Sequence, residues 1–216
     1  MSRALKPIGR SGGTLADEAY QRIADALLAG RLAAGSRLIM DQLADELDIS
    51  RTPVRDALLR LEREGLVEAS GRRGYVVKAA SDIDIEHFYE AREAVEGFAA
   101  RRVAEIGPTA FEQVRRVVET TDSTGVVDVL PLYQMNLRIH RTVVEAVGNP
   151  RLLDLFDDIW QRARGLSTFA DFVANSTSQV SVQEAHLPLL DALQSTPDKA
   201  FKAMRAHIRA GQEQHH

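Results

Sequence analysis

Apolar residues recur every three to four positions in three stretches of the first part of the chain, which is the spacing of an amphipathic helix. These stretches cover residues 15–30, 40–47 and 50–65, and each places its leucines, valines and alanines on one face. A tight break separates the second stretch from the third, and Ser50 or Thr52 can cap the helix that follows it. The pattern therefore predicts a helix, a short helix, a turn and a third helix.

After Gly65 the pattern changes to short extended runs. Residues 66–69 and 75–77 are strand candidates, and the segment 70–74 between them carries two glycines that are typical of a hairpin turn. A helix–turn–helix followed by a basic hairpin is the element order of a winged helix-turn-helix. The first part of the chain is therefore expected to have that fold.

From Ala80 onwards only helical patterns are found, joined by short polar breaks. Six helices are expected there, at residues 82–106, 108–121, 127–147, 150–172, 177–195 and 197–213. The predicted fold is mainly α, an N-terminal winged helix-turn-helix followed by an all-α helical bundle. Its expected divisions are a flexible arm, the winged helix-turn-helix and the helical domain, at residues 1–14, 15–79 and 82–213.

Composition is that of a soluble protein able to bury a core. Of the 216 residues, 44% are hydrophobic and 27% are charged, and no apolar run approaches the ~18–20 residues that a membrane-spanning helix needs. The absence of cysteine excludes disulfides, thiolate metal sites and cysteine nucleophiles. The first dozen residues are basic and lack the apolar segment of a secretory signal, so a cytoplasmic protein is expected.

The net charge of −4 argues mildly against a nucleic-acid binder, but the charge is distributed unevenly. Residues 1–78 hold 13 basic and 11 acidic side chains, whereas the remainder holds 14 and 20. Within the first part, residues 49–78 hold 7 basic and 4 acidic side chains. Positive charge therefore concentrates on the third predicted helix and the hairpin.

The third predicted helix carries residue types that read DNA. In a helix-turn-helix the N-terminal residues of the second helix of the motif face base edges in the major groove. Arginine can contact guanine bidentately, and serine and threonine suit phosphates. Four such residues lie at that end of the helix: Ser50, Arg51, Thr52 and Arg55.

Further basic residues can support the same contact. Arg60 and Arg63 lie farther along the helix and are candidates for the DNA backbone. At the hairpin tip, Gly71, Arg72 and Arg73 can enter a minor groove or follow phosphates. The alternative interpretation of these arginines is a solvated helix face, or a winged helix that serves protein contacts.

Three of the six histidines lie on apolar faces of three different predicted helices, at His140, His186 and His207, and Asn136 precedes the first of them by one turn. Helical bundles build metal sites from inward side chains of facing helices. An oxygen ligand with three imidazoles suits zinc, nickel or a related divalent ion. Taken singly, a histidine in such a place is more often a hydrogen-bonded core or surface residue. The remaining histidines are given no functional role: His87, His215 and His216.

Arg92 interrupts an apolar helix face that Phe88, Val95 and Ala99 continue. A buried guanidinium needs an anion. That anion can be a carboxylate ligand paired bidentately with the arginine, or a structural partner such as Glu96 or a side chain of a neighbouring helix. The sequence leaves both interpretations open.

The run DQLADELDISRTPVRDALLRLEREGLVEASGRRGYVV resembles the DNA-binding domain of GntR-family transcriptional regulators, and the resemblance covers about Leu15 to Val77. It implies a transcriptional regulator, most often a repressor, that binds a pseudo-palindromic operator in double-stranded DNA as a homodimer. The matching positions are Leu43, Ala44, Leu47, Ser50, Pro53, Val54, Arg55, Ala57, Leu58, Leu61, Gly65, Leu66, Gly71, Gly74 and Val76.

Residues from about Asp82 to Gln212 resemble the all-helical effector-binding domain, called FCD, of one branch of that family. Many members of the branch bind a divalent metal through an Asp and a His four residues apart and two later His. The corresponding residues here are Asn136, His140, His186 and His207. Asn136 stands where Asp is commoner; its amide oxygen can ligate but lacks the charge, so metal affinity or preference is expected to differ. The resemblance also implies that Arg92 faces the effector cavity, where a small carboxylate is expected.

Two other functions are alternatives to a ligand-responsive regulator. A metal-assisted hydrolase would need an open coordination position and a general base, and the sequence contains no HExxH motif, Gly-rich phosphate loop or GxSxG elbow, so an enzyme is not expected. The third possibility is a metal-stapled dimerisation module that binds no effector.

Overall fold

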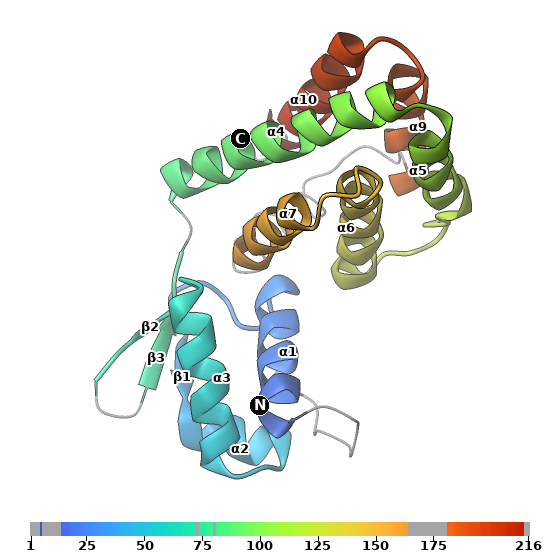
Figure 1. The fold of residues 1–216 in the computed structure, drawn as a ribbon. Coiled ribbons are helices and arrows are strands. Elements are labelled where there is room, and N and C mark those ends of the chain that lie inside the picture. Colours follow the sequence, from blue (N-terminus) through green and yellow to red (C-terminus); the bar gives the residue numbers. More distant parts are fainter. Residues whose placement is uncertain (1–4, 6–13, 72–73, 80, 164–180, 214–216) are drawn as a thin grey trace. The chain divides into compact units, whose positions relative to one another are not determined.

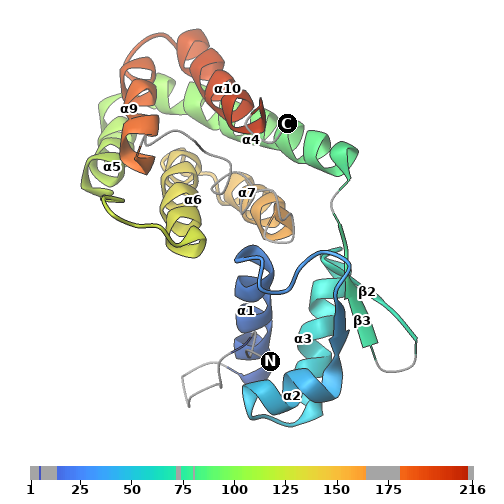
Figure 2. The same ribbon diagram turned by 180° about the vertical axis from the view of Figure 1, so that it is seen from behind.

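The computed structural model describes residue 5 and residues 14–71, 74–79, 81–163 and 181–213. Contacts divide the described residues into two compact units. The first unit consists mainly of the chain up to Ser81 and is called the N-terminal domain; the second, the C-terminal domain, begins at Asp82 with the first residue of a long helix. Figures 1 and 2 show the elements of each domain from opposite sides.

The N-terminal domain combines helices with a small antiparallel sheet. Its described elements are α1 (Leu15–Leu28), β1 (Arg37–Ile39), α2 (Met40–Leu47), α3 (Arg51–Arg63), β2 (Val67–Ala69) and β3 (Gly74–Val77). The strands lie in the order β1-β3-β2, so β3 is the central strand. This is a winged helix-turn-helix, which confirms the predicted fold class for this part of the chain.

The inward faces of the helices form the core of the N-terminal domain. α1 packs against α3, and the side chains that the helical spacing placed inward are buried. They include Ile23, Leu27, Leu47, Val54, Leu58 and Leu61. Thr14 caps α1, because its hydroxyl accepts a hydrogen bond from the backbone N–H of Asp17 at 3.1 Å. Because the inner face of α3 is packed in this core, its opposite face is exposed to solvent.

The strand β1 forms in a segment where the sequence pattern predicts only a turn between two helices. It has three residues, and only Leu38 is buried among them. Leu38 lies opposite Tyr75 of β3 in an antiparallel register. Three residues are too few to show an alternating pattern, and the partner strand lies far along the chain, so this strand forms only through tertiary pairing.

The C-terminal domain is all-helical in its described part, as predicted. Its elements are α4 (Asp82–Ile106), α5 (Pro108–Thr120), α6 (Val129–Glu145), α7 (Pro150–Ala163), α9 (Val182–Leu193) and α10 (Pro197–Glu213). In both views α10 runs beside α4, and this pair packs more extensively than any other pair of described helices. α4 also contacts α5, α6 and α9, so it forms one wall of the bundle.

The predicted helix ends differ from the observed ones by a few residues. The helix expected at 127–147 is shorter by two residues at each end, as Val129–Glu145. Within the helices expected at 150–172 and 177–195, residues 164–172 and 177–180 lie outside the described part of the chain. α9 begins after Ser181, whose side chain forms a reciprocal capping box with Glu184.

Gly97 allows α4 and α10 to approach closely. A Cβ at this position would lie 3.0 Å from Cε2 of Phe201 and 3.3 Å from Cγ of Arg205, both on α10. Gly97→Val is therefore expected to lower the free energy of unfolding by about 1–3 kcal/mol, because the added methyls overpack this contact. Chemical denaturation measures the change. Ala94→Val, on an exposed position of the same helix, should cost less than about 1 kcal/mol, and equal losses in the two variants would contradict the prediction.

Candidate DNA-reading helix and histidine centre

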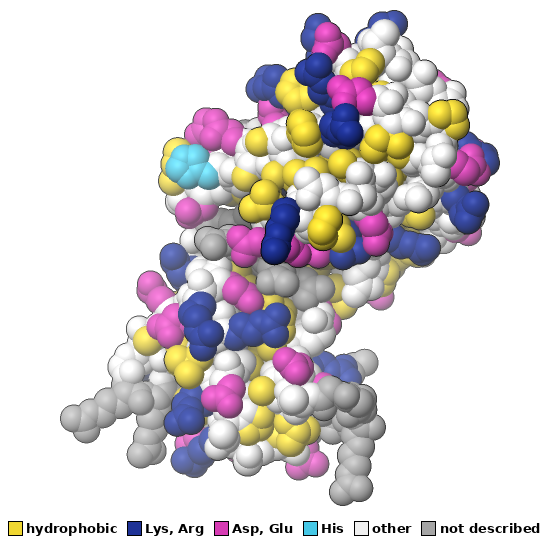
Figure 3. Space-filling model, viewed as in Figure 1, with side chains coloured by type: hydrophobic (Ala, Val, Ile, Leu, Met, Phe, Trp, Pro, Cys, Tyr) yellow, Lys and Arg dark blue, Asp and Glu magenta, His cyan; other side chains and the backbone are white. Residues whose placement is uncertain are grey.

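The N-terminal end of α3 is exposed, whereas its inner face is buried in the domain core. The turn before it is tight because Asp48 adopts a left-handed conformation with φ of 57°. The four residues that the sequence assigned to DNA reading are all exposed: Ser50, Arg51, Thr52 and Arg55. Figure 3 shows Lys and Arg side chains over the part of the N-terminal domain where α3 lies. This end of α3 is therefore available to a large partner.

The two arginines at this end are held differently. Nε of Arg51 lies 2.8 Å from Oδ1 of Asp41 on α2. Nε of Arg55 lies 3.9 Å from Oδ1 of Asp56, and the Arg55 side chain is 59% exposed. Exposed ion pairs contribute little to stability. Arg55 can therefore turn toward a ligand at small cost, while Asp41 pre-orients Arg51.

Arg60 is engaged within the N-terminal domain. Its guanidinium carbon lies 3.7 Å from the ring centroid of Tyr20, and its Nε donates to Glu64 at 3.1 Å. The Tyr20 hydroxyl donates to the same carboxylate at 2.7 Å. These contacts tie α3 to α1, and a contact of Arg60 with the DNA backbone stays a prediction.

The hairpin between β2 and β3 supplies the wing. Gly71 is exposed and has φ of 72°, a conformation that favours glycine. The backbone N–H of Ser70 donates to the carbonyl of Gly74 at 2.8 Å and closes the turn. Arg72 and Arg73, which the sequence assigned to the tip, lie outside the described residues.

The C-terminal domain brings three histidines together from three helices. His140 lies on α6, His186 on α9 and His207 on α10. Nε2 of His140 lies 3.2 Å from Nε2 of His186 and 3.3 Å from Nε2 of His207. His140 and His186 are each 1% exposed, and His207 is partly buried. Three ring nitrogens therefore converge on one point in the bundle.

The partners of the other ring nitrogens fix the protonation of two of these rings. Nδ1 of His186 lies 2.6 Å from the carbonyl oxygen of Val182, which can only accept, so this nitrogen carries the proton. Nδ1 of His140 lies 2.6 Å from Oε2 of Glu96; the contact is short but not aligned as a hydrogen bond, and an unprotonated nitrogen there would be repelled by the carboxylate. In these tautomers both Nε2 atoms carry lone pairs 3.2 Å apart, an arrangement that a cation bound by both nitrogens would stabilise.

The electrostatics of the centre keep the imidazoles neutral. Burial, and then the neighbouring His140, lower the pKa of His186 to about 3. Burial also lowers the pKa of His140, and burial with the two other rings lowers the pKa of His207 well below its usual value. Neutral imidazole is the form that binds a metal. At neutral pH no proton has to leave before these rings can act as ligands.

Glu96 lies completely buried beside the centre. Its carboxylate accepts a hydrogen bond from Nε of Arg92 at 2.8 Å and another from Nε1 of Trp160 at 3.0 Å. Burial raises the pKa of this carboxyl, but the positive charge of Arg92 and its hydrogen bond outweigh that effect and leave the pKa well below its usual range. The sequence pattern indicates Glu96 only as a possible partner of Arg92, and its contact with His140 appears only in the structure.

Arg92 is buried and paired. Besides Nε, its Nη2 lies 3.4 Å from Oε2 of Glu96 and 3.5 Å from Nε2 of His140, and its guanidinium stacks over the ring of Trp160 at 4.4 Å. The intramolecular ion pair, one of the two interpretations left open, is therefore present. An effector contact through Arg92 stays a prediction. Asn136 lies one turn before His140 on α6 with a partly buried side chain, and its assignment as a metal ligand also stays a prediction.

Comparison with known proteins identifies both domains. Residues 15–77 match the family described as "Bacterial regulatory proteins, gntR family", and residues 87–210, more than half of the chain, match the "FCD domain". The chain belongs to the GntR family. It lies in the branch of that family that carries an FCD domain, which confirms the resemblance seen in the sequence.

Relatives of this GntR protein support the assignment. It is 28% identical over 208 residues to the "Probable D-xylose utilization operon transcriptional repressor" of Paenarthrobacter nicotinovorans, an alignment that covers 91% of the chain and 87% of the relative. It is 36% identical over 106 residues to an uncharacterised HTH-type regulator of Agrobacterium vitis, covering 49% of the chain and only 62% of that relative. The solved structure of McbR/YncC from E. coli has a TM-score of 0.69 at 20% identity, covers 94% and 95% of the two chains, and shows the shared fold.

The GntR assignment decides between the classes of function. This protein is a DNA-binding transcriptional regulator with an FCD effector-binding domain, and the metal-assisted hydrolase is not supported. Among the described helices of the regulator, none combines the length and the apolar character needed to cross a membrane.

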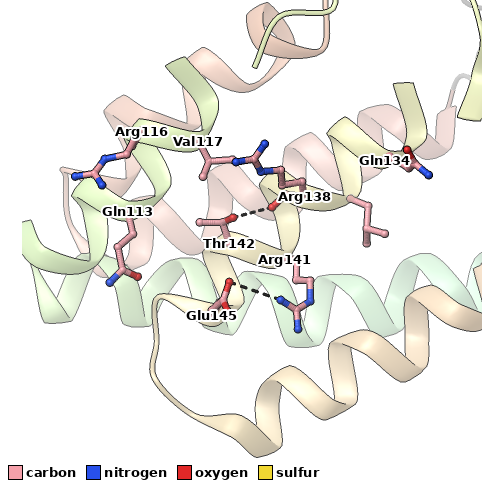
Figure 4. Close-up of a pocket in the computed structure, with 9 residues that line it drawn as sticks. Gln113, Arg116, Val117, Gln134, Arg138, Arg141, Thr142 and Glu145 are labelled. Atoms are coloured by element: carbon pink, nitrogen blue, oxygen red, sulfur yellow. Dashed lines mark hydrogen bonds and ion pairs between the residues drawn. The ribbon is translucent and has the colours of Figure 1, made fainter. Parts of the chain in front are cut away.

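A surface groove of the regulator is lined by residues other than the three histidines. It has a volume of about 640 Å³ and runs between α5 and α6 (Figure 4). Its lining residues are Gln113, Arg116, Val117, Gln134, Leu137, Arg138, Arg141, Thr142 and Glu145. Arg141 is already paired with Asp157 at 2.9 Å. The groove is an open surface feature, whereas the polar groups of the histidine centre are buried and converge on one point.

Proposed function

We propose that this GntR regulator is a repressor that binds a pseudo-palindromic operator as a homodimer, and that a small carboxylate effector bound beside a divalent metal in the FCD domain modulates operator binding. A two-fold dimer presents two winged helices to two half-sites related by the same symmetry. Effector binding changes operator affinity only if it favours one arrangement of the two DNA-binding domains over another.

The observation that carries the metal proposal is the convergence of three imidazole nitrogens. Two nitrogens bound to one tetrahedral zinc at about 2.0–2.1 Å lie about 3.3–3.4 Å apart. The separations of 3.2 and 3.3 Å between the Nε2 atoms are close to that value. Imidazole ligands suit zinc and nickel. The residues present therefore fit a divalent metal held by His140, His186 and His207.

Asn136 completes the proposed ligand set with an amide oxygen. It lies one turn before His140 on α6, so both side chains emerge on one side of that helix. The amide oxygen brings no charge, and the site then holds a divalent cation with four neutral ligands. When bound, such a metal keeps its positive charge and so attracts an anionic effector.

Arg92 is the proposed anchor of the effector carboxylate. Glu96 uses the Nε and Nη2 positions of its guanidinium. An arginine presents a second edge through Nη1, where a carboxylate can bind bidentately. Because Nη2 lies 3.5 Å from Nε2 of His140, a carboxylate on this edge would lie next to the proposed metal.

The proposed DNA contacts combine base readout with phosphate binding. Arg51 and Arg55 are assigned to base edges, and Ser50 and Thr52 to phosphates, because all four lie exposed at the N-terminal end of α3. The wing residues Gly71, Arg72 and Arg73 are assigned to the minor groove or to phosphates.

Elemental analysis of regulator purified without chelators or added metal tests the metal, and the same sample can be extracted for bound small acids. Near-stoichiometric zinc or nickel is expected. Thermal unfolding across a set of small carboxylates then tests the effector; one compound should raise the melting temperature and change operator affinity measured by fluorescence anisotropy.

The controls separate the parts of the proposal. Protein that stays metal-free after zinc is added contradicts the metal, whatever the carboxylates do. A metal-loaded protein whose melting temperature no carboxylate changes is the metal-stapled dimerisation module instead. An acid that raises the melting temperature equally in wild type and Arg92→Met binds elsewhere.

A further inference from the structure

We propose that Glu96 is a positioning residue of the histidine centre, whose buried carboxylate holds the His140 ring with Nε2 turned toward the other two histidines. The inference rests on the proposed metal site and extends it to a residue that is not itself a ligand. A histidine that binds a metal through one ring nitrogen is oriented by whatever contacts the other one.

The carboxylate of Glu96 is fixed by contacts from three helices. Arg92, one turn earlier on α4, donates to Oε1 at 2.8 Å; Trp160 of α7 donates to the same oxygen at 3.0 Å; and Nδ1 of His140 on α6 lies 2.6 Å from Oε2. The side chain of Glu96 is completely buried. A carboxylate anchored in this way has little freedom to follow the His140 ring, so the ring must adopt the orientation that the carboxylate sets.

The Nδ1 atoms of His186 and His140 contact different kinds of partner. His186 uses the neutral carbonyl of Val182, one turn earlier on its own helix. His140 uses a charged group from another helix, so its orientation depends on how α4 packs against α6. A charged partner also makes the ring a stronger ligand than a carbonyl does. Removing the charge of Glu96 should therefore weaken metal binding, even though the carboxylate does not touch the metal.

A purely structural role is the alternative, since Arg92 and Glu96 form a buried ion pair. Glu93 provides a matched control on the same helix. It is 9% exposed, and its carboxylate accepts from Arg205 and Arg209 at 2.6 Å each. Glu93→Gln removes a largely buried, doubly paired carboxylate from α4 without changing the pair that contacts His140.

Zinc affinity of the full chain, measured by competition with a chromophoric chelator, is the first test. Glu96→Gln is expected to weaken zinc binding by about 10–100-fold. The zinc affinity of Glu93→Gln should stay within about 3-fold of wild type, a smaller change than the 10–100-fold expected for a residue that orients a metal ligand. In cobalt-loaded protein the visible d–d absorption should shift in Glu96→Gln and not in Glu93→Gln. Equal losses in the two variants, or none in Glu96→Gln, overturn the proposal.

A second measurement uses only wild-type protein, so its result does not depend on whether a variant folds. In metal-free wild-type protein labelled with ¹⁵N-histidine, two-bond ¹H–¹⁵N correlation spectra report which nitrogen of His140 carries the proton. A proton on Nδ1 is expected, and a proton on Nε2 overturns the proposal. Wild-type protein that binds no zinc would contradict the metal site of the proposed function, while the tautomer of His140 would still decide the role of Glu96.

Discussion

Zinc at 100 to 1,000 times its dissociation constant is expected to raise the free energy of unfolding of the wild-type regulator by about 2.7–4.1 kcal/mol, and His186→Ala to remove most of that gain. The ligands are brought together only by the fold, because they come from α6, α9 and α10. The unfolded chain therefore binds the metal less tightly. Burial also holds the pKa of His186 at about 3, so the ring is neutral and ready to bind at pH 7.

Denaturant unfolding in the presence of zinc or of a chelator measures this gain. His87→Ala is the matched control, since His87 is an exposed histidine on α4; its response to zinc should equal that of wild type. A zinc response in His186→Ala as large as in wild type would remove His186 from the site. Operator DNA should still bind to His186→Ala, because the DNA-binding domain has its own core.

Helical periodicity is enough to predict the faces on which the three histidines lie. His140, His186 and His207 each fall among apolar positions, and apolar faces of bundle helices turn inward. Periodicity cannot tell which ring nitrogen points to the centre, because that depends on Val182 and Glu96, one a backbone carbonyl and the other a side chain of a distant helix.

Glu96 shows which contacts a local sequence pattern can predict and which it cannot. Its spacing from Arg92 is i,i+4, so an ion pair between them could be considered from the sequence alone. Its contact with His140 arises from packing of α4 against α6, and its contact with Trp160 involves α7. The strand β1 was missed for the same reason, since Leu38 becomes a strand residue only through Tyr75.

Arg55→Ala is expected to weaken operator binding by about 1–3 kcal/mol, a loss of about 5–150-fold, and to relax discrimination at one base pair of each half-site. Arg55 lies at the N-terminal end of α3 with a side chain that is 59% exposed and only loosely paired with Asp56. Its removal should therefore leave the fold unchanged. Fluorescence anisotropy with the natural operator and with single base-pair variants, at fixed salt concentration, measures both effects.

Arg55→Lys distinguishes a base contact from a phosphate contact, because lysine keeps the charge and loses the planar fork that binds guanine bidentately. If Arg55 contacts a base, the lysine variant should lose discrimination as the alanine variant does. Equal weakening for all operator variants, recovered by lysine and accompanied by a salt-dependence slope smaller by about 1 in Arg55→Ala, would assign Arg55 to a phosphate. The base contact is the expected result, since Arg55 is exposed near the end of α3 that faces base edges in a helix-turn-helix, whereas Arg60 is held by Tyr20 and Glu64.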